Sequence, residues 1–125
     1  MMFGASKFLS ELKNLGFNAE IIKGSDQNDY VVIKDYEIAL GRFAGNVIDL
    51  GIFAPTDYPR NIGSAIHVKA DPQLFEKTDS VPNVRNITDS ALGAEWRYWS
   101  HNFNWTSEQN ARRLISQINT IFQNA

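Results

Sequence analysis

Five β-rich runs, joined by spacers too short to hold a helix, constrain the fold of this chain more than any other feature. The runs are Glu20 to Lys23, Tyr30 to Tyr36, Glu37 to Phe43, Val47 to Ala54 and Ser64 to Lys69. Parallel neighbours need a long crossover connection, whereas antiparallel neighbours can be joined by a short turn. The junction between Tyr36 and Glu37 is the least distinct of them. We therefore expect an antiparallel meander of about four strands.

The clearest turns between these runs are polar or small. They are the segment from Gly24 to Asp29 and the segment from Ala44 to Asn46. Glycine, asparagine and aspartate tolerate the positive φ that tight turns need.

A short helix is predicted before the first run. Apolar residues recur at helical spacing at Phe8, Leu12 and Leu15. Ser6 is a candidate cap, and Gly16 followed by Phe17 is typical of a left-handed helix stop with its hydrophobic contact.

After Ala70 the β pattern ends. The segment from Asp71 to Gly93 contains prolines, asparagines and aspartates but few apolar residues, which predicts an irregular surface stretch.

A long amphipathic helix is predicted after this stretch, and Thr106 and Gln109 have the spacing of a capping box at its start. Its apolar stripe is Ala111, Leu114, Ile115, Ile118, Ile121 and Phe122. The fold class that follows is α+β, in one domain over residues 1–125.

Charge and hydropathy limit the classes of partner that the protein is expected to bind. The net charge is -2, which produces no strong field for nucleic acid or an anionic membrane. The first residues lack the features of a secretory signal, and no apolar run is long enough to span a bilayer. We expect a cytoplasmic protein that binds neither nucleic acid nor membrane.

The chain contains no cysteine. Disulfides, thiolate nucleophiles, thiolate metal sites and thioester carriers are therefore excluded. No glycine-rich phosphate motif is present either, so we expect no cofactor.

Two histidines are the candidates for metal binding or acid and base chemistry. With a carboxylate, His67 and His101 have the residue types of a metal site, but their spacing gives no support. We expect His67 to lie on the strand face opposite Ile66 and Val68, His101 to form a local cap or hydrogen bond, and no metal to bind. Ser100 next to His101 lacks the surroundings of an activated nucleophile.

The irregular segment also carries two candidate carboxylates, Asp71 and Asp79. Their positions permit a catalytic pair, but aspartates in loops mostly stabilise turns. Spacing alone therefore assigns neither a catalytic role.

Large rings crowd the segment before the last helix. We expect Trp99 and Trp105 to belong to the core, because they can cover the end of the sheet and the start of the helix. For Trp96 and Tyr98, core and partner site remain equal alternatives.

The order of these elements resembles the E2, or ubiquitin-conjugating-like, superfamily. The segment Ala54 to Pro59 is similar to that family's strand-to-Tyr-Pro turn, and the strand Ala65 to Lys69 leads into Asp71-Pro72 as the family's leads into His-Pro-Asn. Trp105-Thr106-Ser107 resembles the Trp-Ser-Pro that opens the family's hydrophobic helix. Trp99-Ser100 near Trp105 is similar to the C-terminal signature of prokaryotic E2 family E.

The departures from this resemblance bear on activity. Asp71 and Gln73 flank Pro72 where the family has His and Asn, and the region Asp79 to Asn83 has no cysteine. Ser80 does not replace it, because an unactivated hydroxyl is a poor nucleophile. The resemblance therefore implies an inactive member that uses the fold for binding.

Three hypotheses remain open. The first is a non-catalytic adaptor of a bacterial ubiquitin-like system, which binds a ubiquitin-like protein or an E1-like enzyme. Its binding surface is the exposed face of the sheet, the turn with Tyr58 and Pro59, or the aromatic segment with Trp96 and Tyr98. The second is an enzyme with non-cysteine acid and base chemistry around Asp71, which requires polar groups to converge there. The third is an interaction or immunity-type protein that shares only the fold.

Overall fold

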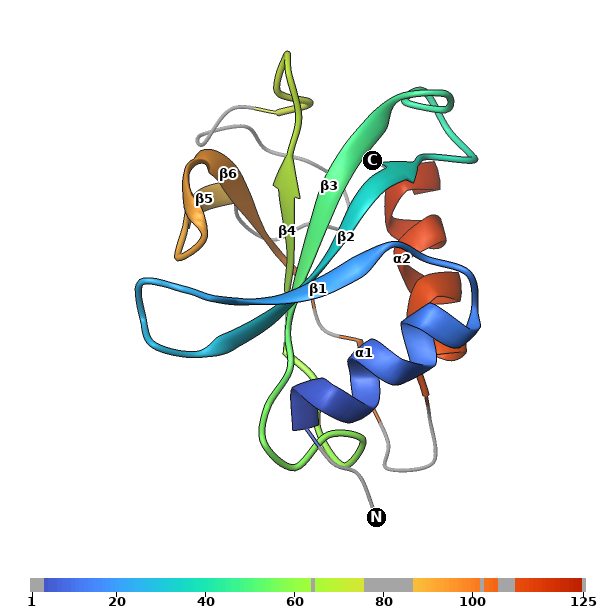
Figure 1. The fold of residues 1–125 in the computed structure, drawn as a ribbon. Helices are drawn as coiled ribbons and strands as arrows, with labels where there is room; N and C mark the ends of the chain where they lie inside the picture. The colour runs from blue at the N-terminus through green and yellow to red at the C-terminus, as the bar shows by residue number, and fades with distance from the viewer. Residues whose placement is uncertain (1–3, 64, 76–86, 102, 106–109, 125) are drawn as a thin grey trace.

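The described residues form two helices that pack against one face of an antiparallel sheet (Figure 1). In this computed structural model they are residues 4–63, 65–75, 87–101, 103–105 and 110–124. The helices are α1 (Gly4–Asn14) and α2 (Ala111–Asn124). The strands are β1 (Ala19–Lys23), β2 (Asp29–Glu37), β3 (Val47–Phe53), β4 (Ala65–Lys69), β5 (Ile87–Ser90) and β6 (Gly93–Ser100). The α+β class is confirmed, with six strands where about four were expected.

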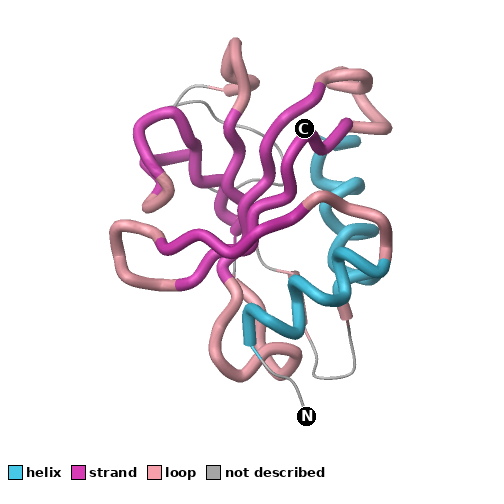
Figure 2. The backbone as a smooth tube through the Cα atoms, viewed as in Figure 1, coloured by secondary structure: helices cyan, strands magenta, loops and turns pink. Residues whose placement is uncertain are grey.

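The strand order is β1-β2-β3-β4-β6-β5, and every neighbouring pair is antiparallel. Consecutive strands are neighbours from β1 to β4, so the predicted meander is confirmed. β6 pairs with β4, and β5 lies outside it at the edge. The strands twist strongly across the sheet, as Figure 2 shows.

The core lies between the sheet and the two helices. One face of the central strands supplies branched residues at alternate positions, as the two-residue period of a strand dictates. These residues are Val31, Ile33, Ile48, Leu50, Ile52, Ile66 and Val68, and all are buried. The helices cover them with Phe8 and Leu12 of α1 and with Leu114, Ile118 and Phe122 of α2. The predicted apolar stripe of the last helix therefore faces the core.

The opposite face of the sheet is also largely covered. Tyr30 and Val32 of β2 are almost fully buried there. The tips of two hairpins meet over this face, because the Ser25 N–H donates to the Ala91 carbonyl at 2.8 Å. Leu92 lies beside Gly51 of β3, where an added Cβ would approach its side chain to 2.6 Å. A second, smaller cluster of buried side chains is thus enclosed beneath the hairpins.

The predicted stop of the first helix is confirmed. Gly16 has a φ of 94°, and its N–H donates to the Lys13 carbonyl. The Phe17 N–H donates to the Leu12 carbonyl at 3.1 Å. Together these bonds form the Schellman motif, which satisfies carbonyls at the helix end. The start differs from the prediction, because Gly4 already begins the helix two residues before Ser6.

Two segments correct the prediction for strands. Glu37 to Phe43 is not a separate strand, because β2 ends at Glu37 and residues 38–46 form a loop before β3. The loop closes through a hydrogen bond from the Ile38 N–H to the Asn46 carbonyl and one from the Gly45 N–H to the Ile38 carbonyl. The segment Asp71 to Gly93 contains β5, so its end is regular, while residues 76–86 lie outside the described residues.

The start of α2 is capped by two side chains, one directly before the helix and one from the distant first helix. Thr106 and Gln109 lie outside the described residues. Asn110 Oδ1 accepts the Arg113 N–H at 3.2 Å, and Oε1 of Glu11 accepts the Ala111 N–H at 3.0 Å. Side-chain oxygens at these positions satisfy N–H groups that have no partner within the helix.

Candidate functional site

A cleft of about 570 Å³ lies where the chain leaves the sheet after β4. Its walls come from β2, the start of β3, the segment after β4 and the start of β6. The lining side chains are Asp35, Val47, Ile48, Asp49, Lys69, Ala70, Asp71, Gln73 and Glu95. Asp71 therefore lines this cleft. The cleft combines apolar groups with carboxylates.

A bulge in β2 places Asp35 at the cleft. The pairing register with β3 shifts between Ile33 and Tyr36, and Asp35 has a φ of 55°. Aspartate tolerates this left-handed conformation better than most residues, and bulges redirect side chains. The Asp35 N–H donates to Oδ1 of Asp49 at 3.2 Å, which holds the bulge against β3.

Ion pairs cross the strands beside the cleft. Nζ of Lys34 lies 3.5 Å from Oδ2 of Asp49 and 3.8 Å from Oε1 of Glu20. Nζ of Lys69 lies 3.2 Å from Oε2 of Glu95. These pairs are partly exposed, so each contributes little to the free energy of folding. They show that Glu20, Asp49 and Glu95 already have a cationic partner.

Gln73 joins the segment after β4 to β6. Its Nε2 donates to the Glu95 carbonyl at 2.5 Å, while its buried Oε1 has no hydrogen-bond partner among the described residues. Gln73 stands where the E2 pattern has the asparagine that stabilises an oxyanion. Here the amide nitrogen of Gln73 already donates a hydrogen bond to a backbone carbonyl of the protein.

His67 lies on the face opposite Ile66 and Val68, as predicted, and it is only 3% exposed. Its Nδ1 lies 2.7 Å from Oγ of Ser90. The same oxygen accepts the Leu92 N–H at 3.0 Å, and the His67 tautomer sets which partner donates in the bond to the ring. Burial lowers the pKa of His67 to about 4, so the ring is neutral at pH 7.

The ring of His67 packs edge to face against two tyrosines. The ring centres of Tyr30 and Tyr98 lie 4.9 and 5.4 Å from that of His67. A small cavity of about 100 Å³ adjoins these three rings and is also lined by Phe53, Gly63 and Ala65. His67 therefore belongs to the enclosed cluster of the outer face and does not line the cleft of Asp71.

His101 lies in a third place. Its ring packs against Phe103 at 5.0 Å between centres, and it lines a cavity with Gln117, Thr120, Ile121 and Asn124 of α2. The three residues considered for acid and base chemistry thus line three different cavities. Asp79 and Ser80 lie outside the described residues.

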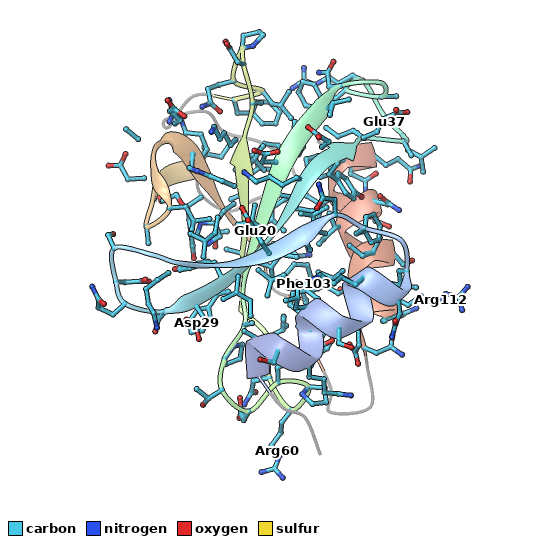
Figure 3. All side chains as sticks on the ribbon, in the orientation of Figure 1. Glu20, Asp29, Glu37, Arg60, Phe103 and Arg112 are labelled. Atoms are coloured by element: carbon cyan, nitrogen blue, oxygen red, sulfur yellow. The ribbon has the colours of Figure 1, made fainter. Side chains whose placement is uncertain are left out.

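The Tyr-Pro turn is held from beneath by two side chains. Tyr58 is fully buried, and its hydroxyl donates to Oε1 of Glu11 at 2.5 Å. Nε1 of Trp105 donates to the Pro59 carbonyl at 2.7 Å. Tyr58 therefore has no exposed surface to offer a partner, whereas Pro59 and Arg60 are accessible, and Figure 3 shows Arg60 pointing away from the body of the protein.

The aromatic residues of β6 divide between the two faces of the sheet. Trp99 is 1% exposed and packs between Phe75 and Phe122, which confirms its expected place in the core. Trp96 is 7% exposed on the outer face, while Tyr98 is only partly buried. Trp105 is partly buried against the core, as expected. Of the two outer-face rings, Tyr98 is therefore the more accessible.

Glu11 and Asp35 occupy structural positions that the sequence did not reveal. Glu11 is the acceptor for Tyr58 and for the start of α2, and it also pairs with Lys7 at 3.3 Å. Its position on the first helix, four residues after Lys7, suggests only a surface ion pair. Asp35 lies inside a β-rich run, and no local pattern marks the bulge.

The described part of the chain contains no group of three His, Asp or Glu side chains that could hold a metal ion. Neither α1 nor α2 is long and apolar enough to cross a membrane.

Comparison with known proteins gives one match. The family model described as prokaryotic E2 family E matches residues 6–125, which is nearly the whole chain. No curated protein and no solved structure matches the chain. A match of this extent establishes membership. The chain belongs to prokaryotic E2 family E.

Proposed function

We propose that this chain is a non-catalytic E2-like domain that serves as a protein-binding adaptor in a bacterial ubiquitin-like modification system. Its partner is a ubiquitin-like protein or an E1-like enzyme. One observation carries the proposal: Asp71-Pro72-Gln73 follows β4 at the place of His-Pro-Asn in a family member that has no cysteine. The chain keeps the fold of a conjugating enzyme without the thiol that conjugation needs.

The chemistry of the described residues supports a binding role. Thioester transfer needs a thiolate, and no serine or histidine is among the described residues that line the cleft of Asp71. The pair formed by Ser90 and His67 is a weak alternative, because a base with a pKa of about 4 has little affinity for a serine proton at pH 7. An enzyme that acts through Asp71 with either histidine would need these groups in one pocket, and they line separate cavities.

Two accessible places are candidates for the binding surface. The Tyr-Pro turn offers Pro59 and Arg60, and β6 offers the partly buried ring of Tyr98. Tyr58 and Trp96 are buried, so their substitution would disturb folding together with binding. Surface substitutions at Arg60 and Tyr98 are therefore the better test.

The test uses purified protein as bait in extracts of the native host, with captured proteins identified by mass spectrometry. Wild type, Arg60→Glu and Tyr98→Ser are compared with Arg112→Glu, a charge-matched change on the exposed side of α2 (Figure 3). The proposal expects a ubiquitin-like protein or its E1-like enzyme with wild type and Arg112→Glu. It expects a weaker signal with at least one of the other two variants.

A second arm tests whether the domain is inert. The captured ubiquitin-like protein, its E1-like enzyme and ATP are incubated with the domain, and covalent adducts are sought on denaturing gels. The proposal expects binding without an adduct. An adduct would assign the chain a transfer activity through a hydroxyl or amine, and capture of neither partner would favour an interaction protein that shares only the fold.

A further inference from the structure

The cleft at the end of β4 has unsatisfied negative charge on two sides. Among the described residues that line it, four are carboxylates, Asp35, Asp49, Asp71 and Glu95, and one is a cation, Lys69. Asp49 and Glu95 already pair with lysines. Asp35 and Asp71 form no ion pair with any described residue, and both are exposed.

An exposed apolar side chain separates these two carboxylates. Val47 is 55% exposed at the start of β3 and lines the same cleft, together with Ala70. Because β3 lies between β2 and β4, Val47 stands between the strand of Asp35 and the strand that leads to Asp71. Exposed valine at a strand start is unremarkable alone, but within a cavity it gives a ligand an apolar contact.

The strand spacing gives the separation that a ligand has to bridge. Neighbouring strands lie about 4.8 Å apart, so two steps across the sheet place the carboxylates roughly 10 Å apart. An extended peptide advances about 3.3 Å per residue and presents alternate side chains on one face. Two lysines at positions i and i+4 of such a peptide lie on the same face, and their flexible side chains can reach two carboxylates at this separation. The residue at i+2 then lies between them, over Val47.

From this geometry we infer that the cleft receives an extended basic segment of a partner protein, with cationic side chains at Asp35 and Asp71 and an apolar side chain on Val47. The inference rests on the proposed function, because it names the kind of partner segment that the adaptor recognises. Charge complementarity selects a basic polypeptide over an acidic one. The bulge that places Asp35 and the Gln73 bond that anchors the opposite wall hold the two sides in position.

The test titrates labelled protein with a capped Lys-Ala-Leu-Ala-Lys peptide and follows backbone amide shifts by NMR. The inference expects shifts at Asp35, Val47 and Asp71, and weaker binding at higher salt. In Asp35→Asn/Asp71→Asn, the dissociation constant rises about tenfold, as the loss of two partly exposed ion pairs predicts. Asp29→Asn/Asp57→Asn removes equal charge at the other end of the strands and should bind the peptide like wild type.

Three results would overturn the inference: equal binding of a Glu-Ala-Leu-Ala-Glu peptide, shifts confined to another surface, or unchanged binding by Asp35→Asn/Asp71→Asn. The adaptor proposal is judged separately, by capture of its partner. Capture by Asp35→Asn/Asp71→Asn at wild-type strength would also overturn the assignment of the cleft while leaving the adaptor proposal in place. Peptide binding without capture would count against the adaptor proposal alone.

Discussion

The hydroxyl of Tyr58 donates a hydrogen bond of 2.5 Å to Oε1 of Glu11. The same oxygen accepts the Ala111 N–H, so one carboxylate joins the first helix, the Tyr-Pro turn and the start of the last helix. A hydrogen bond to a charged group contributes more than one between neutral groups. The Tyr-Pro turn of this protein is therefore a structural joint as much as a surface feature.

Glu11→Ala should lower the free energy of unfolding by about 2–4 kcal/mol, because the tyrosine hydroxyl and the helix N-terminus both lose their acceptor. Urea denaturation followed by circular dichroism measures the change. Lys7→Ala is the control, since it removes only the partly exposed ion pair and should cost about 1 kcal/mol or less. Equal losses in the two variants would contradict a joint at Glu11.

Trp105→Phe replaces the indole with a smaller aromatic ring and removes the Nε1–H that donates to the Pro59 carbonyl. We expect a loss of about 1 kcal/mol, the usual net contribution of one such hydrogen bond. Equilibrium unfolding measures it, and a loss above about 3 kcal/mol would show that packing at this position matters more than the bond.

Gly41→Ala should be strongly destabilising. Gly41 has a φ of 88°, and an added Cβ would lie 2.7 Å from the Phe122 carbonyl oxygen at the end of α2. Gly45→Ala is a matched control, because its φ is 91° but nothing lies within 4 Å of the added atom. Gly45→Ala should lower the free energy of unfolding by about 1 kcal/mol, from the strained backbone alone, and Gly41→Ala should lower it clearly more. If the two variants had similar midpoints of thermal unfolding, the close approach of Gly41 to α2 would not be a cause of destabilisation.

Acid should destabilise the protein through His67. Burial lowers the pKa of His67 to about 4, while the unfolded chain has the ordinary value of 6.5, so the unfolded state binds the proton more readily. The stabilisation is complete above pH 6.5 and is lost as the pH falls from there towards 4. Its full size is about 3 kcal/mol, from the difference between the two pKa values.

His67→Asn keeps a side chain that can donate to or accept from Ser90 and removes the titration, so its unfolding free energy should depend less on pH between 6.5 and 4. The nearby Asp26 carboxylate, which opposes the lowering of the histidine pKa, stays in place. His101→Asn serves as the control and should keep the wild-type pH profile. An unchanged profile in His67→Asn would mean that other groups govern acid unfolding.

The parts of the fold with strong local patterns were predictable. The stop at Gly16 follows from the need for a left-handed residue, and the apolar stripe of the last helix from its period. The meander followed from spacers too short for helices. These features depend on neighbours along the chain, which the sequence displays directly.

The parts that failed depend on distant residues. Glu37 to Phe43 is rich in branched and aromatic residues, but β2 ends at Glu37 and the loop turns back towards α2, where Gly41 lies against Phe122 and Gln123. The sequence suggests that Tyr58 lies at a binding surface, because it does not display the hydrogen bond from the Tyr58 hydroxyl to Glu11 in the first helix. The sequence marks Asp71 as a candidate site residue but not Asp35, which reaches the same cleft through a bulge in β2.

The meeting of the hairpin tips at Ser25 and Ala91 has a consequence for how this family can diverge. The tips belong to opposite edges of the sheet, yet the length of one sets the space left for the other. An insertion in the turn before β2 would have to be matched by a shorter or differently shaped turn before β6. We expect the two turns to vary in concert among relatives, although neither contains a residue of the cleft.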